Sequence, residues 1–265
     1  MHDMRAYKSA FFLQMQSTLC YRANILFYLT AVLIPPLAIF FLWRTVLGEV
    51  DALGAYDLGT MITYYVVVQF FIAHTPFSAW VEIGESIRDG SLTLWLVRPA
   101  NHYGLYLGRL LGSWVPFWLL GLGGTAGVAA LLHRYFQFQT DPVLIGAAVL
   151  MWLGGVILGF TWGYMLNLVA FWTERATGMV VLAEQAASFL AGGVIPLDLL
   201  PLQELWLFLP FRFAGWLPTQ IYLGRVSRSE LPLEFLKLLI WLMAFCVLVQ
   251  WLWRRGLRRF AGVGV

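Results

Sequence analysis

Six long apolar segments, separated by short polar ones, dominate the sequence. They cover about residues 23–43, 58–78, 103–132, 143–171, 179–195 and 233–253. A helix needs about 20 predominantly apolar residues to cross the hydrocarbon core of a bilayer, and these segments are close to that length. Charged residues make up 12% of the 265 residues, too few for the surface of a water-soluble protein of this size. The sequence therefore predicts an all-α, polytopic membrane protein, with six transmembrane helices in a single transmembrane domain covering residues 1–265.

Residues 1–22 have the pattern of a helix that lies in the membrane interface. Apolar side chains recur there every three or four residues, and polar side chains fall elsewhere on the helical wheel. The apolar positions are Met4, Tyr7, Phe11, Met15 and Leu19. This periodicity is typical of an amphipathic helix that buries one face. We therefore predict an N-terminal interfacial helix that leads into the first span.

Residues 196–230 are apolar, but prolines interrupt them before any run reaches spanning length. These are Pro196, Pro201, Pro210 and Pro218. Proline removes a backbone donor and breaks helices. Irregular backbone is tolerated at membrane depth only where it packs against protein. The segment is therefore expected to form short re-entrant helices on the external side, before the last span.

A polar stretch, residues 79–100, lies between the second and third apolar segments. Read as a helix, it places Trp80, Ile83 and Ile87 on one face and four polar residues on the other. The polar residues are Glu82, Glu85, Ser86 and Asp89. Such an amphipathic helix is expected to lie along the membrane surface rather than cross it. Gly90 is well placed to end it, because a helix C-cap commonly requires positive φ; an ordinary solvated loop is the alternative.

The basic residues indicate how the chain is oriented in the membrane. With six spans, both termini lie on one side, and that side carries 11 of the 17 Lys and Arg residues. Cytoplasmic loops carry the excess of Lys and Arg. Both termini and residues 79–100 are therefore expected in the cytoplasm. The arginine-rich tail, residues 254–259, can rest on anionic headgroups of membrane lipid.

One acidic residue falls deep inside a predicted span. Glu184, beside Gln185, lies within the fifth apolar segment. An ionisable group at the centre of a bilayer costs about 2.5–3.5 kcal/mol on insertion scales, so it should face the protein interior or a partner. Glu184 and Gln185 are candidates for a translocation path or a subunit contact. A packing role, with Glu184 protonated or hydrogen-bonded to a neighbouring helix, is the alternative.

Glycines recur every four residues in two of the spans. The third span carries Gly104, Gly108 and Gly112, and the fourth carries Gly155, Gly159 and Gly163. Small residues at this spacing let helix backbones approach closely in lipid. Both sets are therefore predicted to be helix-packing surfaces, most simply within one subunit.

The sequence lacks the residues that catalysis or nucleotide binding requires. A phosphate-binding P-loop needs Gly-Lys followed by Ser or Thr, and neither Lys8 nor Lys237 follows a glycine. The four histidines are scattered, and no His or Cys pair has metal-ligand spacing. No basic run is long enough to indicate nucleic acid. We therefore expect a non-enzymatic chain with no cofactor or metal of its own.

With these residues described, the chain resembles the membrane subunits of ATP-binding-cassette exporters of the ABC-2 type. Within EIGESIRDGSLTLWLVRPA, five residues fit a G-x-L-x-x-x-L-x-R-P stretch of a bacterial subgroup of these permeases. They are Gly90, Leu92, Leu96, Arg98 and Pro99. FWTERATG and the succession GGVIPLDLLP, LPF and LPTQIYLG are similar to the same subgroup.

The resemblance implies half of a dimeric export pathway in a bacterial inner membrane, driven by two copies of a cytoplasmic ATPase that binds ATP and Mg. The second permease is identical or homologous. In that family the loop between the second and third spans docks on the ATPase, with the entry helix beside it. Carried onto this chain, the resemblance makes residues 79–100 the coupling segment and residues 196–230 external helices at the exit. The implied docking residues are Glu82, Glu85, Arg88, Asp89 and Arg98.

The aromatic and Met side chains of the spans suit an amphipathic or lipid-like cargo. A stand-alone ion-coupled carrier is the competing reading. Such a carrier more often shows several buried ionisable groups and repeated halves, and an intramembrane enzyme requires paired catalytic groups within the spans.

Overall fold

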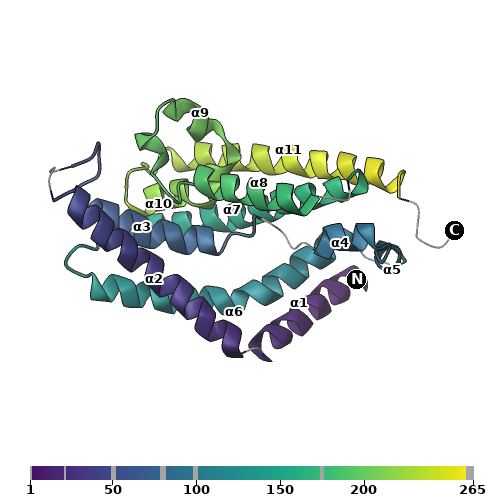
Figure 1. The fold of residues 1–265 in the computed structure, drawn as a ribbon. Helices are drawn as coiled ribbons and strands as arrows, with labels where there is room; N and C mark the ends of the chain where they lie inside the picture. Colours follow the sequence, from purple (N-terminus) through teal and green to yellow (C-terminus); the bar gives the residue numbers. More distant parts are fainter. Residues whose placement is uncertain are drawn as a thin grey trace.

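The described part of the chain forms helices joined by short connections in the computed structural model (Figure 1). It comprises residues 2–20, 22–48, 52–77, 82–97, 101–173 and 176–260. One isolated bridge, between Leu53 and Tyr56, is the β-type pairing found among these residues. The all-α class predicted from the apolar segments is thus confirmed.

Six helices overlap the six predicted spans. They are α2 (Arg22–Val46), α3 (Leu58–Ala73), α6 (His102–Leu131), α7 (Pro142–Leu168), α8 (Ala176–Leu190) and α11 (Leu231–Leu257). Among the described residues, α6, α11 and the continuous stretch Pro142–Phe171 are long and apolar enough to cross a membrane. The stretch Pro142–Phe171 joins α7 to the short helix η1 (Val169–Phe171).

Two of the predicted spans end earlier than the sequence indicated. The second was expected to reach residue 78, but α3 stops at Ala73, because Pro76 disfavours helical backbone in the residue before it. The fifth was expected to reach residue 195, but α8 stops at Leu190, and Gly192 follows with φ +88°. Positive φ ends a helix at little steric cost when the residue is glycine.

The short helices lie in the two regions that break the apolar pattern. The polar stretch holds α4 (Glu82–Arg88) and α5 (Leu92–Leu96). The proline-rich region holds η2 (Leu197–Leu199), α9 (Gln203–Phe208), η3 (Pro210–Ala214) and α10 (Trp216–Tyr222). The longest of these has seven residues, so the described residues around the prolines form only short helices.

The first helix, α1 (His2–Cys20), packs along the first half of α6. Tyr7 and Phe11, on the predicted apolar face, are partly buried, whereas Leu19 is half exposed because it lies beyond the contact with α6. Tyr7 contacts Gly104 and Gly108, and Phe11 contacts Gly112, so the two helices run in the same direction.

Two ends of the molecule can be distinguished in Figure 1. The start of α1, the helices α4 and α5, and the end of α11 lie together at one end. The connection between α6 and α7 lies with α10 at the opposite end. Among the three described helices long enough to cross a membrane, the one containing α7 is the most buried, with half of its apolar window inside the molecule against 17% for α6 and α11.

Candidate functional site

The polar stretch folds back onto the end of α7. Ile83 and Ile87 of α4 are buried in a cluster with Leu92, Tyr164 and Leu168. Gly84 approaches α7 so closely that an added Cβ would lie 3.1 Å from Oδ1 of Asn167. Burial of two isoleucines contributes about 1.5–3 kcal/mol each. Ile83 and Ile87 of the predicted apolar face therefore bind to protein, and Trp80 lies outside the described residues.

The opposite face of α4 carries the predicted docking acids. Glu85 and Asp89 are exposed, and Glu82 keeps half of its side chain exposed while its Oε2 pairs with Nη2 of Arg109 at 3.1 Å. Arg88 is partly buried, and Arg98 lies outside the described residues. The acidic side chains thus share one surface at this end of the molecule.

Ser86 does not belong to that polar surface. The helical pattern placed it with the acids, but it is 5% exposed, and its hydroxyl donates to the backbone oxygen of Ile83. A serine hydroxyl can donate its hydrogen bond to a backbone carbonyl in the preceding turn of its own helix. Ser86 is therefore buried instead of facing outward with the acids, and that part of the prediction is wrong.

Gly90 and Asp89 form the joint between α4 and α5. Gly90 has φ +79°, as predicted for the residue that ends α4. The Oδ1 of Asp89 accepts a hydrogen bond from the backbone N–H of Ser91 at 2.9 Å. Hydrogen bonds from Ser91 hold the pKa of the Asp89 carboxyl below its usual value. Asp89 therefore remains an exposed negative charge at neutral pH.

An aromatic cluster connects α5 with three spans. The His102 ring at the start of α6 stacks on Trp253 of α11, with centroids 4.9 Å apart, and meets Trp95 of α5 edge-on. Its Nδ1 lies 2.9 Å from the hydroxyl of Tyr164 in α7. The cluster borders a cavity of about 240 Å³. Helix α5, which has no counterpart among the helices predicted from the sequence, is thus fixed to α6, α7 and α11.

The glycines of α6 face α1. An added Cβ at Gly104 would lie 3.0 Å from the Tyr7 ring, and one at Gly108 would lie 3.1 Å from the backbone oxygen of Tyr7. At Gly112 it would collide with the backbone oxygen of Phe11. All three glycines therefore lie at contacts where another residue would push α1 outward.

The glycines of α7 face other partners. A Cβ at Gly155 would collide with the backbone of Phe213 in η3, and one at Gly159 would lie 2.6 Å from Cγ2 of Thr75. Gly163 is buried, and its carbonyl accepts a hydrogen bond from Nδ2 of Asn167 at 2.9 Å. Gly155 and Gly159 thus contact η3 and the segment after α3 of the same chain.

Glu184 lies on α8 and is partly buried, while Gln185 is exposed. The neighbouring Val181 and Leu182 expose 49% and 72% of their surfaces. An exposed face of this composition suits lipid or another protein chain. Glu184 therefore lies at the border between the molecule and whatever covers α8.

The end of α8 is held by hydrogen bonds from α3. The hydroxyls of Tyr64 and Tyr65 donate to the carbonyls of Gly192 and Val194, and Nε2 of Gln69 donates to that of Gly193. The preceding carbonyl, of Ala191, accepts the backbone N–H of Trp216 at 2.7 Å. Four consecutive carbonyls beyond the helix are thus satisfied by the protein, as membrane-buried backbone requires. The sequence does not reveal these donors, because a Tyr or Gln in an apolar run does not indicate its partner.

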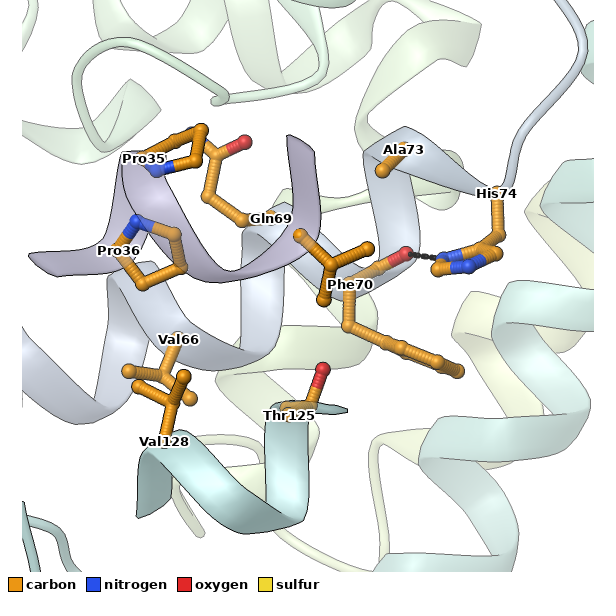
Figure 2. Close-up of a pocket in the computed structure, with 10 residues that line it drawn as sticks. Pro35, Pro36, Val66, Gln69, Phe70, Ala73, His74, Thr125 and Val128 are labelled. Atoms are coloured by element: carbon orange, nitrogen blue, oxygen red, sulfur yellow. Dashed lines mark hydrogen bonds between the residues drawn. The ribbon is translucent and has the colours of Figure 1, made fainter. Parts of the chain in front are cut away.

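His74, at the end of α3, was one of the scattered histidines. It is 1% exposed; its Nδ1 contacts the backbone oxygen of Phe70, as Figure 2 shows, and its Nε2 contacts the hydroxyl of Tyr28 in α2. The adjacent pocket, between Pro35, Pro36 and Gln69, holds about 30 Å³. That volume admits one or two water molecules, so the pocket is too small for a lipid-like cargo.

The proline-rich region is anchored through Asp198. Its Oδ1 accepts hydrogen bonds from the hydroxyl of Tyr56 and from Nε1 of Trp216, each at 2.9 Å. Nε2 of Gln220 donates to the Tyr56 hydroxyl, and the Arg225 guanidinium lies 4.0 Å from the centroid of its ring. Asp198 thus ties η2 and α10 to the connection before α3. Spacing along the chain gives no sign of this network, because its members are far apart in sequence.

The described residues define an all-helical, multi-pass membrane protein with a charged amphipathic segment at one end. Within them, no three His, Cys, Asp or Glu side chains come together in a way that could hold a metal ion. A family model described as ABC-2 family transporter protein matches residues 33–264. The chain therefore belongs to the ABC-2 transporter family, as the sequence resemblance indicated.

Family membership makes the chain a membrane permease component of an ABC transporter, in a class that is generally non-catalytic and associates with an ABC ATPase. No curated protein and no solved structure matches the chain.

Proposed function

We propose that this chain forms half of a dimeric export pathway in the bacterial inner membrane, with both termini in the cytoplasm. Two copies of a separate cytoplasmic ATPase, which bind ATP and Mg, supply the energy, and the second permease is identical or homologous. The observation that carries the proposal is the two-sided coupling segment, α4 and α5. One side of this segment is acidic and exposed, and the other side packs against the spans.

The exposed side of this segment suits a protein partner. Beside Glu85 and Asp89, helix α5 exposes Leu94 by 65%, and Val97 just beyond it is exposed by 81%. Apolar side chains surrounded by charged ones are typical of protein interfaces. We propose that Glu82, Glu85, Arg88 and Asp89 contact the ATPase, with Arg98 near the same junction.

The side of the segment that packs against the spans can transmit movement to three of them. Helix α4 contacts α7 through Ile83, Ile87 and Gly84, while Trp95 of α5 reaches α6 and α11 through the His102 ring. A ligand shifts a conformational equilibrium only through contacts that differ between the two states. Closure of the ATPase subunits would tilt α4 and α5 and thereby rock the spans against one another.

We propose that α2, α3 and α8 span the membrane with the three longer helices, which gives six spans. Helix α3 has 16 residues and is about 24 Å long, less than the hydrocarbon thickness of about 30 Å. The four residues 74–77 that follow are all buried, and Nε1 of Trp152 donates to the backbone oxygen of Phe71. This packing supports membrane burial of the irregular segment.

A charge reversal tests the docking surface. We expect Glu82→Lys with Glu85→Lys to reduce co-purification of the ATPase in mild detergent, because two repulsive contacts replace attractive ones. Glu230→Lys is the matched control, since Glu230 is an exposed acid near the start of α11, at the other end of that helix from the arginine tail. Wild-type ATPase association and transport-coupled hydrolysis in the double variant would overturn the docking proposal.

A further inference from the structure

A large groove opens between α9, η3 and the first half of α11. Its volume is about 700 Å³. Leu207 and Phe208 of α9 form one wall, and Trp241 and Ala244 of α11 form another. The Phe208 and Trp241 rings meet edge-on with centroids 5.7 Å apart. The volume lies in the range of ligand pockets, about 300–1,000 Å³.

Three charged side chains lie together in this apolar groove. Glu234 pairs through Oε2 with Nη2 of Arg212 and, through Oε1, with Nζ of Lys237 at 2.8 Å. Arg212 is 6% exposed, and its Nε has no hydrogen-bond partner among the described residues. A buried charge requires pairing, and one carboxylate here serves two cations. The triad therefore carries one unit of positive charge in excess.

The fourth charged residue of the groove has a different environment. Glu204 lies exposed on the α9 rim. Water and salt screen an exposed charge, whereas charges in a low-dielectric site act more strongly. The positive excess beside Arg212 therefore dominates the interior of the groove.

The groove residues of α11 form a gradient along one helix face. Glu234, Lys237, Trp241 and Ala244 follow one another at three- and four-residue spacing, so they share a face. The face runs for about 15 Å from a charged start to an apolar end. An amphiphile with a charged head and an apolar tail has the same distribution.

We infer that this groove binds an anionic amphiphile, a lipid-like molecule whose acidic headgroup contacts Lys237 and Arg212. The tail lies along Trp241 and Ala244 toward the middle of the membrane. Lys237 is 45% exposed and can donate to an incoming anion, because its ammonium has three donors and Glu234 accepts one. This inference rests on the proposed function, which places the groove at the external side, and it specifies the cargo class.

The test uses the full-length protein, purified in a neutral detergent without any ATPase. Native mass spectrometry measures retention of phosphatidylglycerol against phosphatidylcholine and diacylglycerol with the same acyl chains. We expect preferential retention of phosphatidylglycerol, weakened about tenfold or more by Lys237→Gln, because a hydrogen bond to a charged group is lost. Ala244→Trp fills the groove at an exposed position and should abolish the preference. Arg228→Gln, which removes an exposed arginine outside the groove, is the matched control.

Three results would overturn the inference. The first is equal retention of the three lipids, or retention unaffected by both groove variants. The second is displacement of the lipid by inorganic phosphate alone, which indicates a free-anion site. The third is disulfide formation between two chains carrying Ala244→Cys with Cys20 and Cys246 replaced by Ser, which makes the groove a subunit interface. Failure of the wild-type protein to co-purify an ATPase, with intact lipid binding, would instead count against the proposed function.

Discussion

The hydroxyl of Tyr64 donates a hydrogen bond to the carbonyl oxygen of Gly192 at 2.8 Å, and so joins α3 to the point where α8 ends. Gly192 has φ +88°, and an added Cβ there would lie 2.5 Å from the same hydroxyl. Both residues are buried. The end of α8 is therefore stabilised by the fold, because α3 supplies the hydrogen-bond donor that a continuing helix would have given to this carbonyl.

Removal of that donor should destabilise the protein. Tyr64→Phe leaves the buried Gly192 carbonyl without a partner, and we expect a loss of about 1–3 kcal/mol in stability. Thermal unfolding in detergent micelles measures it. Tyr135→Phe is the control, because Tyr135 is only partly buried and its hydroxyl makes no hydrogen bond within the described part of the chain. Equal melting temperatures of the two variants would contradict this account.

Any side chain at Gly112 should destabilise the contact between α1 and α6. Gly112→Ala places a methyl group against the backbone oxygen of Phe11, which cannot rotate away, and we expect a cost of about 1–3 kcal/mol. Gly123→Ala, on the same helix with nothing within 4 Å of the new methyl, should instead stabilise by up to about 1 kcal/mol. Unfolding curves of both variants check the opposite signs. Stabilisation by both variants would show that helix propensity outweighs the contact.

Glu184→Gln tests the acid on α8. The amide keeps the size of the side chain and its ability to hydrogen-bond but removes the charge, so we expect reduced transport with unchanged thermal stability. ATP-dependent transport by reconstituted vesicles and the melting temperature are the two measurements. Unchanged transport and assembly would leave Glu184 only a packing role.

The ion pair between Asp141 and Arg228 should make stability depend on pH. Nη2 of Arg228 lies 2.5 Å from Oδ2 of Asp141, and this hydrogen bond lowers the pKa of the Asp141 carboxyl. A depressed pKa contributes stability that is present above the unfolded-state pKa of about 3.9 and is lost as the pH falls through the folded-state pKa.

Asp141→Asn isolates this effect, because asparagine is an equally good N-cap for α7. We expect the difference in melting temperature between wild type and variant to be constant above about pH 5 and to shrink below about pH 4. Arg228→Gln should converge with wild type over the same range. A difference that persists at the lowest pH would show that the carboxylate acts without its charge.

The coupling segment shows which structural features the local side-chain pattern can predict and which it cannot. Side-chain periodicity predicted a helix ended by Gly90, and α4 with its positive-φ glycine matches it, because both features depend on residues a few positions apart. The same periodicity was wrong for Ser86, since a hydroxyl can be buried by bonding to its own helix. Helix α5 was missed, because its five residues are too few to show a period.

The sequence alone determined the all-helical class, the positions of six apolar helices, and the short helices around Pro196, Pro201, Pro210 and Pro218. These features follow from the length and polarity of the apolar segments and from the backbone restriction that proline imposes. Only the tertiary structure decided that Gly112 meets Phe11, that Tyr64 caps Gly192, and that Arg212 pairs with Glu234. The physical reason is that, in a membrane, many apolar helix faces are equally compatible with lipid. The partners of each helix are therefore fixed by shape and hydrogen bonding between segments far apart in sequence.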